Sequence, residues 1–259
     1  QQKQDEQRRA LSDIAFQEAM DSLHNNSEEK SMKLHQVDVE LAKKIENRYR
    51  DQGYTRPTVL ILVPTRGYAY TLVMRMLELL PPRQKSLIQN LSSFHEQYGD
   101  KDGVYHTSAT KSLDYQLTFQ GNSDDCFRFG IQFSRTSLKL LSPLYSSDII
   151  IASPLGLKLV VGCEGSEPHE RKADFLTSIE ISIIDQLQII QHQNIDHFKD
   201  VMQALNGFPS QTNHIDFSRV RNYYFDGQAR FFRQNLWFSS IFTPELLYLY
   251  SIFAENKNG

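Results

Sequence analysis

Four segments of this chain place polar side chains directly after short apolar runs. They are 58–66 (TVLILVPTR), 147–157 (SDIIIASPLGL), 180–188 (EISIIDQLQ) and 234–244 (QNLWFSSIFTP). In an open sheet of parallel strands, functional loops collect at the carboxyl ends of the strands. We therefore expect the hydroxyl, guanidinium and carboxylate groups of these segments to meet at one end of a sheet.

Hydrolysis of a nucleoside triphosphate is one reaction that such an arrangement performs. It needs a glycine-rich phosphate loop with a lysine, ligands for magnesium, and a group that activates water. The sequence contains no GxxxxGK[ST]; the nearest segment, EEKS at 28–31, has two carboxylates that would repel phosphates. After the apolar run that ends at Ile184, Asp185 is followed by Gln186, which cannot accept a proton as a general base does. We interpret Lys30, Ser31, Asp185 and Gln186 as a vestigial nucleotide site, and we predict no catalytic residue, metal or cofactor.

Two of the segments keep binding chemistry. Thr65 and Arg66 place a hydroxyl and a guanidinium after an apolar run, and both groups suit the phosphate oxygens of a single RNA strand. Ser153 adds a hydroxyl at an expected helix start, with Lys158 beyond it. These four residues are candidate RNA contacts; the alternative is that they cap loops within a surface covered by protein.

A third candidate surface is a run of arginines in the last quarter of the chain. Arg219, Arg221, Arg230 and Arg233 alternate with five aromatic residues, which are Tyr223, Tyr224, Phe225, Phe231 and Phe232. Aromatic rings and guanidinium groups stack on and neutralise single-stranded RNA. The same residue types are enriched in protein interfaces, so both interpretations stay open.

Composition limits the class of protein. The 259 residues carry a net charge of −3, so RNA binding would require a local patch rather than a generally basic surface. The two cysteines, Cys126 and Cys163, lack a CxxC pattern, and we expect neither a disulfide nor a zinc site. No apolar run approaches the ~20 residues that span a bilayer. We expect a soluble, non-secreted protein, and because the chain begins with Gln1, a piece of a longer one.

The periodicity of apolar residues predicts alternating strands and helices. We expect strands at 59–63, 127–133, 148–152, 179–184 and 236–240, and helices at 69–80, 137–141, around 197–205 and at 244–253, the last capped by Thr243. A surface excursion near 94–125 would contain one short strand at 115–119. Residues 1–50 would form helices that pack on the core or extend from it. Alternating strands and helices favour an α/β domain with a mostly parallel sheet over residues 51–259.

The order of the four segments resembles the motif order of DEAD-box-type helicases, which implies a RecA-like (P-loop NTPase-like) fold and the first helicase-type lobe only. More specifically, the chain resembles the digestive organ expansion factor family. The resemblance rests on RDQGYTRP at 50–57, GNSDDCFR at 121–128, YSSDIIIASPLGL at 145–157, IIDQ at 183–186 and FSRVR at 217–221. It implies a U3 small nucleolar RNA-associated pseudo-helicase of the small-subunit processome, which acts in the nucleolus in processing of small-subunit ribosomal RNA.

The same resemblance implies the partners. They would be processome proteins and the U3 ribonucleoprotein, with contact to precursor ribosomal RNA or U3 RNA, and no membrane or small-molecule substrate. The chain departs from the family pattern at Thr65, where the family has Phe, and at Leu187-Gln188, where it has Ala-Asp. Two alternatives remain: an active RNA-dependent ATPase or helicase whose missing motifs lie outside this chain, and a general RNA-binding module.

Overall fold

The computed structural model describes residues 53–81, 87–100, 110–119, 121–134, 137–162, 173–211 and 215–256. They belong to one of two units, which spans 52–259. The helices predicted within residues 1–50 lie outside the described residues, and so do Lys30 and Ser31 of the predicted vestigial nucleotide site.

The described residues form one seven-stranded sheet with the order β2-β4-β3-β5-β1-β6-β7. The strands are β1 (Val59–Leu62), β2 (Ile88–Gln89), β3 (Arg128–Phe133), β4 (Leu138–Ser142), β5 (Ile149–Ala152), β6 (Ile181–Ile184) and β7 (Gln234–Trp237). Four neighbours, β5, β1, β6 and β7, are parallel, whereas β3 is antiparallel to both β4 and β5. The predicted α/β class with a mostly parallel sheet is confirmed.

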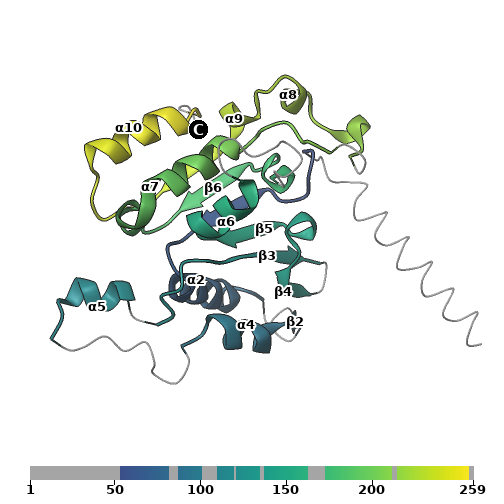
Figure 1. The fold of residues 1–259 in the computed structure, drawn as a ribbon. Helices are drawn as coiled ribbons and strands as arrows, with labels where there is room; N and C mark the ends of the chain where they lie inside the picture. Colours follow the sequence, from purple (N-terminus) through teal and green to yellow (C-terminus); the bar gives the residue numbers. More distant parts are fainter. Residues whose placement is uncertain are drawn as a thin grey trace, which may run out of the picture. The chain divides into compact units, whose positions relative to one another are not determined.

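Helices cover both faces of this sheet. The described α-helices are α2 (Arg66–Glu78), α4 (Leu91–Tyr98), α5 (Leu113–Phe119), α6 (Pro154–Val161), α7 (Leu187–Ala204), α8 (Asn222–Phe225), α9 (Ala229–Phe232) and α10 (Pro244–Phe253). Figure 1 shows α6, α7 and α10 on one side of the sheet and α2 and α4 on the other. Each set of helices shares a buried apolar cluster with the strands beneath it.

The burial of the central strand β1 on both faces explains why the sequence of a parallel strand is a continuous apolar run. Leu60 and Leu62 belong to the cluster of α6, α7 and α10, whereas Ile61 and Val63 belong to the cluster of α2 and α4. All four side chains are buried. A strand with helices on both faces has no polar face, so its residues do not alternate.

Several predicted elements are confirmed at their expected places. The strands around 59–63, 127–133, 148–152 and 179–184 are present, as is the helix predicted at 69–80. The closing helix α10 starts at Pro244 as predicted, with the Thr243 Oγ1 accepting a hydrogen bond from Leu246 N at 3.2 Å. No helix of the described part of the chain is long and apolar enough to cross a membrane.

Two predicted elements were wrong. Residues 137–141 form strand β4 rather than a helix, with Leu138 and Leu140 pointing inward in the alternation of a strand that packs on one face. Residues 115–119, predicted as a strand, belong to helix α5, in which the rings of Tyr115 and Phe119 meet at 4.7 Å between centres. That spacing of four residues puts both rings on one helical face.

The predicted surface excursion near 94–125 begins too early. Its first residues belong to α4, and Phe94 and Tyr98 of that helix are buried against β3. Figure 1 shows α5, later in the same segment, lying away from the sheet. The helix expected around 197–205 is also longer, because α7 starts at Leu187 and bends at Asn194, whose φ and ψ of −163° and 104° are not helical.

Candidate interaction site at the carboxyl ends of the strands

The structure brings the four chemistry-bearing segments to one end of the sheet. Because β5, β1, β6 and β7 are parallel neighbours, the residues after each strand lie along the same edge. Hydrogen bonds join these loops: Leu187 N donates to the Phe238 carbonyl at 3.0 Å, and Gln193 Nε2 donates to the Pro64 carbonyl at 3.4 Å. The expectation that these segments meet is confirmed.

The amino end of α2, where Thr65 and Arg66 lie, is closed by a neighbouring loop. Arg66 N donates to the Asp124 carbonyl at 2.9 Å, and Gly67 N donates to the Asn122 carbonyl at 2.8 Å. Thr65 is buried, and its side chain makes no capping hydrogen bond. Free N–H groups at a helix start are what bind phosphate. Here two of them are already used by carbonyl groups.

The Arg66 guanidinium is held by four groups of the protein. Its Nε lies 3.0 Å from Asp124 Oδ2, Nη1 donates to the Gln97 carbonyl at 3.3 Å, and Nη2 donates to the Cys126 carbonyl at 3.2 Å. The guanidinium carbon stands 5.2 Å from the centre of the Tyr98 ring. Arg66 therefore fixes the loop that precedes β3 against α2.

Ser153 caps helix α6 and is fully buried. Its Oγ accepts a hydrogen bond from Gly156 N at 2.9 Å and donates to the Asp125 carbonyl. Gly156 lies against the backbone of Phe127, where an added Cβ would stand 2.0 Å from the carbonyl oxygen. The Ser153 hydroxyl thus has no exposed surface and donates its hydrogen within the protein, whereas the RNA contact expected for Ser153 stays a prediction.

Lys158, the fourth candidate RNA contact, lies on α6 and forms an ion pair with Asp200 of α7. About a fifth of its side chain is exposed, 22%. The pair joins the two helices that cover one face of the sheet. Its ammonium group is therefore partly neutralised before any ligand arrives.

Residues 185–188 stand where a nucleotide-hydrolysing enzyme has its magnesium ligand and water-activating group, and here their side chains form hydrogen bonds within the protein. Asp185 Oδ1 accepts a hydrogen bond from Gln186 N at 2.9 Å, and Gln186 has a left-handed φ of 56°. Gln188 Nε2 donates to Gln186 Oε1 at 2.8 Å, and Gln188 Oε1 accepts from Ser240 N at 3.2 Å. The Ser239 hydroxyl donates to the Ile241 carbonyl at 2.6 Å. Gln188 thus links the loop after β6 to the loop after β7.

Tyr68 faces this network from α2. Burial raises the pKa of the Tyr68 phenol, and the negative charge of Asp185 raises it further. The phenol therefore stays neutral near the Asp185 carboxylate. In the described ranges, no group of three or more His, Cys, Asp or Glu side chains gathers to hold a metal ion.

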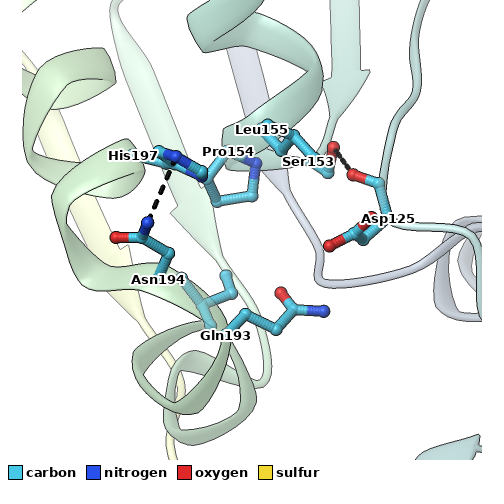
Figure 2. Close-up of a pocket in the computed structure, with 8 residues that line it drawn as sticks. Asp125, Ser153, Pro154, Leu155, Gln193, Asn194 and His197 are labelled. Atoms are coloured by element: carbon cyan, nitrogen blue, oxygen red, sulfur yellow. Dashed lines mark hydrogen bonds between the residues drawn. The ribbon is translucent and has the colours of Figure 1, made fainter.

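A pocket of about 300 Å³ lies beside these loops. Figure 2 shows Asp125 and residues 153–155 on one side of it, and Gln193, Asn194 and His197 of α7 on the other. Asn194 Nδ2 and His197 Nε2 are 3.2 Å apart. Because Asp125 contributes a carboxylate to the lining, the pocket suits a neutral or cationic group better than a phosphate.

The arginine run lies at the opposite end of the sheet. Arg221 Nη1 is 3.4 Å from Glu180, which precedes β6, and 2.9 Å from the Tyr223 hydroxyl. Arg230 Nε is 3.2 Å from Glu255, and its guanidinium stacks 5.1 Å from the centre of the Phe231 ring. These side chains precede β6 and β7, so they belong to a different surface from Arg66 and Asp185. Arg219, half-buried, lies in the 3-10 turn Phe217–Arg219 before them.

Arg233, the fourth arginine of the run, lies inside the domain, and its expected role in an interface stays a prediction. It is 3% exposed, and it donates to Asn235 Oδ1 at 3.0 Å, to Asn206 Oδ1 at 2.6 Å and to the Phe253 carbonyl at 2.9 Å. Burial lowers the pKa of its guanidinium to about 10. Arg233 therefore supports α10 and the loop after α7 from inside the protein.

Sequence reasoning missed the residues that close the site. The sequence analysis did not name Asp124, Asp125 or Gln193 as site residues. Asp124 forms an ion pair with Arg66, Asp125 lines the pocket, and Gln193 donates a hydrogen bond to the loop after β1. Asp124 follows an Asn-Ser pair and accepts a hydrogen bond from Cys126 N at 2.8 Å, which is the pattern of an Asx turn. That local signal could have identified the turn, but not its partner on α2.

The sheet topology and the loops at its carboxyl edge define an α/β domain of NTP hydrolase-like type. Comparison with known families agrees, because the model described as "UTP25, NTP hydrolase-like domain" matches residues 12–259. The chain belongs to this family. The family resemblance stated from the sequence is thereby confirmed.

Relatives named "U3 small nucleolar RNA-associated protein 25" match most of the chain. The Schizosaccharomyces pombe relative is 40% identical over 214 residues, which cover 83% of this chain and 32% of the relative. The Kluyveromyces lactis relative is 44% identical over 194 residues, covering 75% and 26%. This chain spans about a third or less of the curated relatives it matches. Among solved structures, a DEAD box protein from the hyperthermophile Methanococcus jannaschii aligns with a TM-score of 0.37 and 13% identity over 79% of this chain and 37% of that one.

Proposed function

We propose that this chain is a non-catalytic interaction domain of an assembly factor in the small-subunit processome, which works in the nucleolus on precursor small-subunit ribosomal RNA. Family membership and relatives of about 40% identity named for the U3 small nucleolar RNA support the setting. Its partners would be processome proteins and the U3 ribonucleoprotein. The proposed role uses no cofactor and no small-molecule substrate.

One observation carries the non-catalytic part of the proposal: donors at the helix starts of the site already bind protein groups. The amino end of α2 is closed by the carbonyls of Asn122 and Asp124, and Leu187 N at the start of α7 is used by Phe238. Catalysis of phosphoryl transfer depends on donors that are held ready for the developing charge. At this site the N–H donors hold loops together, so they are not free to stabilise a reacting phosphoryl group. This arrangement favours a surface of fixed shape.

For the remaining candidate contacts we propose two roles. Arg66 and Lys158 hold loops and helices, and RNA reaches only their exposed parts, since both are paired with carboxylates. Arg221 and Arg230 belong to a protein interface at the other end of the sheet, where their charges are already balanced by Glu180 and Glu255. Exposed aromatic rings beside guanidinium groups are typical of such interfaces.

Two measurements on the full-length protein test this proposal. The tagged protein, purified from cell extract at moderate salt, should enrich both U3 RNA and precursor small-subunit RNA. ATP turnover by the purified protein should stay at background with and without RNA, and Asp185→Ala should change nothing.

The two results can fail separately. RNA-stimulated turnover that disappears in Asp185→Ala would show an active ATPase completed by motifs outside this chain. Absence of U3 RNA and precursor RNA from the purified protein would refute the setting instead. Equal, strongly salt-dependent binding of unrelated RNAs would indicate a general RNA-binding module.

A further inference from the structure

The pocket beside the strand ends contains a carboxylate that has no partner in the described part of the chain. Asp125 is half-buried, and its backbone carbonyl accepts a hydrogen bond from the Ser153 hydroxyl. Among the described residues, its carboxylate forms neither an ion pair nor a hydrogen bond. The neighbouring Asp124, in contrast, is paired with Arg66 at 3.0 Å. A carboxylate that has lost part of its water gains most from a cationic ligand.

Gln193, on the other side of the pocket, adds a second acceptor. Its Nε2 donates to the Pro64 carbonyl at 3.4 Å, so the amide oxygen is the atom that remains for a ligand. Figure 2 shows the side chains of Asp125 and Gln193 directed toward the same space. Gln193 and Asn194 are exposed, so the pocket opens to solvent. Several acceptor oxygens around one space suit a planar guanidinium with five N–H donors better than a compact ammonium group.

The remaining walls of the pocket are apolar. Pro154, Leu155 and Ile190 line it, and the stem of a long cationic side chain packs well against such groups. Leu159 is four residues after Leu155, so both lie on one face of α6, and Leu159 is 63% exposed. A small cation would leave Leu159 uncovered. A protein segment with an apolar residue beside the cationic one would fill the pocket and also cover Leu159.

The start of α6 is a feature of the pocket that attracts an anion. Gly156 N donates to Ser153 Oγ at 2.9 Å, and Pro154 has no N–H group. The N–H group of Leu155, in the same first turn, has no partner among the described residues. A phosphate at this donor would face the Asp125 carboxylate, which repels it. A peptide carbonyl can accept from Leu155 N without bringing a negative charge into the pocket.

We propose that this pocket binds an arginine side chain of a partner protein, within a segment that carries an apolar residue beside the arginine. The guanidinium would bind Asp125 and Gln193, and the apolar neighbour would cover Leu159. This inference rests on the proposed function, because it names the chemistry of a partner for the same edge of the sheet. Arginine is enriched among the residues that dominate binding in protein interfaces. RNA is disfavoured, because its backbone has the same sign of charge as Asp125.

Photo-crosslinking in cells tests the proposal on the tagged full-length protein. Leu159 is replaced by p-benzoylphenylalanine, which keeps an apolar group beside the pocket, and the crosslinked segment is sequenced. We expect a defined segment of another protein with an arginine next to the crosslinked residue. Asp125→Asn keeps the backbone carbonyl that binds Ser153, and it should lower the crosslink yield at least about tenfold. Asp226→Asn, which removes an exposed carboxylate after α8, should leave the yield unchanged.

Four results of this experiment would overturn the proposal. They are no crosslink above the unirradiated sample, a crosslink within the same polypeptide, a crosslinked segment without arginine, and a yield that Asp125→Asn leaves unchanged.

The crosslinked segment then serves as the probe in a titration of the purified full-length protein. It is synthesised with arginine or with citrulline, which has a similar shape but no charge. We expect citrulline to weaken binding about 30-fold, as loss of a dominant interface contact does. Asp125→Asn should weaken binding of the arginine peptide by a similar factor and change binding of the citrulline peptide by less than about twofold. Two effects that simply multiply would show that the arginine does not meet Asp125.

RNA is tested separately with oligocytidine, because the exocyclic amine of cytosine is a donor that a carboxylate accepts. We expect Asp125→Asn to leave the affinity for oligocytidine unchanged or to raise it. Weaker binding of oligocytidine by Asp125→Asn would assign the pocket to RNA and overturn the proposal. U3 RNA and precursor RNA are measured in the same purification. Their absence from the unmodified protein would refute the proposed function, whereas their presence with a crosslink that does not depend on Asp125 would refute this inference alone.

Discussion

Replacement of Gly156 by alanine should destabilise the protein, although the same change stabilises most helices. Gly156 lies in the first turn of α6, and its Cβ would stand 2.0 Å from the Phe127 carbonyl oxygen and 2.6 Å from the carbonyl carbon. Backbone atoms cannot rotate away as a flexible side chain can. Helix α6 must therefore move away from the residues that lead into β3.

The magnitude follows from three contributions. Overpacking of a close contact costs about 1–3 kcal/mol. Movement of α6 also weakens the cap in which Ser153 Oγ accepts from Gly156 N at 2.9 Å, and a lost cap costs about 1 kcal/mol. The higher helix propensity of alanine offsets about 1 kcal/mol of this loss of unfolding free energy. The expected net loss is about 2 kcal/mol of unfolding free energy.

Urea unfolding followed by circular dichroism measures this change. With a slope of about 2 kcal/mol per molar urea, the midpoint of Gly156→Ala should fall by about 1 M. Gly207→Ala is the matched control, because its Cβ would meet only the Ala204 carbonyl at 3.8 Å. An unchanged or higher midpoint for Gly156→Ala would refute the close packing of α6 on this segment.

Three further predictions concern charged and phenolic groups. Arg56 binds the Asp148 carboxylate through Nε at 3.1 Å and Nη2 at 3.0 Å, so Arg56→Lys should lower the free energy of unfolding in urea by about 1–2 kcal/mol. Arg75→Lys is the control and should change this free energy hardly at all, because Arg75 belongs to an exposed ion pair; equal effects of the two variants would contradict the prediction. Burial raises the pKa of Tyr98 to about 12 from 10.0, so its stabilising contribution is complete below pH 10 and is lost as pH rises toward 12. The ultraviolet titration of the wild type minus that of Tyr98→Phe should show one tyrosine that ionises near pH 12, and a difference centred at pH 10 would refute this prediction. Arg233→Met should lower the unfolding free energy by about 3 kcal/mol, because three protein acceptors lose their donor; weaker U3 RNA binding at unchanged stability would instead restore its role in an interface.

The central strands could be predicted because burial on both faces leaves a clear trace in the sequence. Ile149, Ile150 and Ile151 of β5 form the continuous apolar run that is typical of a strand covered on both faces. Prediction failed where only one face is buried and the segment is short. Residues 137–141 alternate as a strand but are as short as a helical turn, and residues 115–119 alternate as well but belong to helix α5. In both cases the neighbours in space, which the local sequence does not specify, decide the structure.

For the candidate site too, the sequence predicted one part, the position of the residues, and did not predict another, which of their polar groups are free. That Thr65, Ser153, Asp185 and the segment from 234 lie at strand ends follows from the order of apolar runs, and the structure agrees. Which polar groups remain free does not follow. Arg66 is paired with Asp124 only because the loop before β3 folds over the start of α2. The residue type predicts a donor, whereas tertiary contacts decide whether that donor meets a ligand.

The two ends of the sheet are therefore suited to different tasks. At the carboxyl ends of the strands, Gln188 joins the loops after β6 and β7, and carbonyls close the start of α2, so the surface is stiff and its donors are largely used. At the amino ends, aromatic rings such as Phe231 and Phe232 remain exposed beside balanced arginines. A stiff surface with used donors presents a fixed shape to a partner. Exposed aromatic groups gain most from being covered, because they lose contact with water. A domain with these two surfaces can join other components without any chemical step, which is the physical basis for the proposed role in assembly.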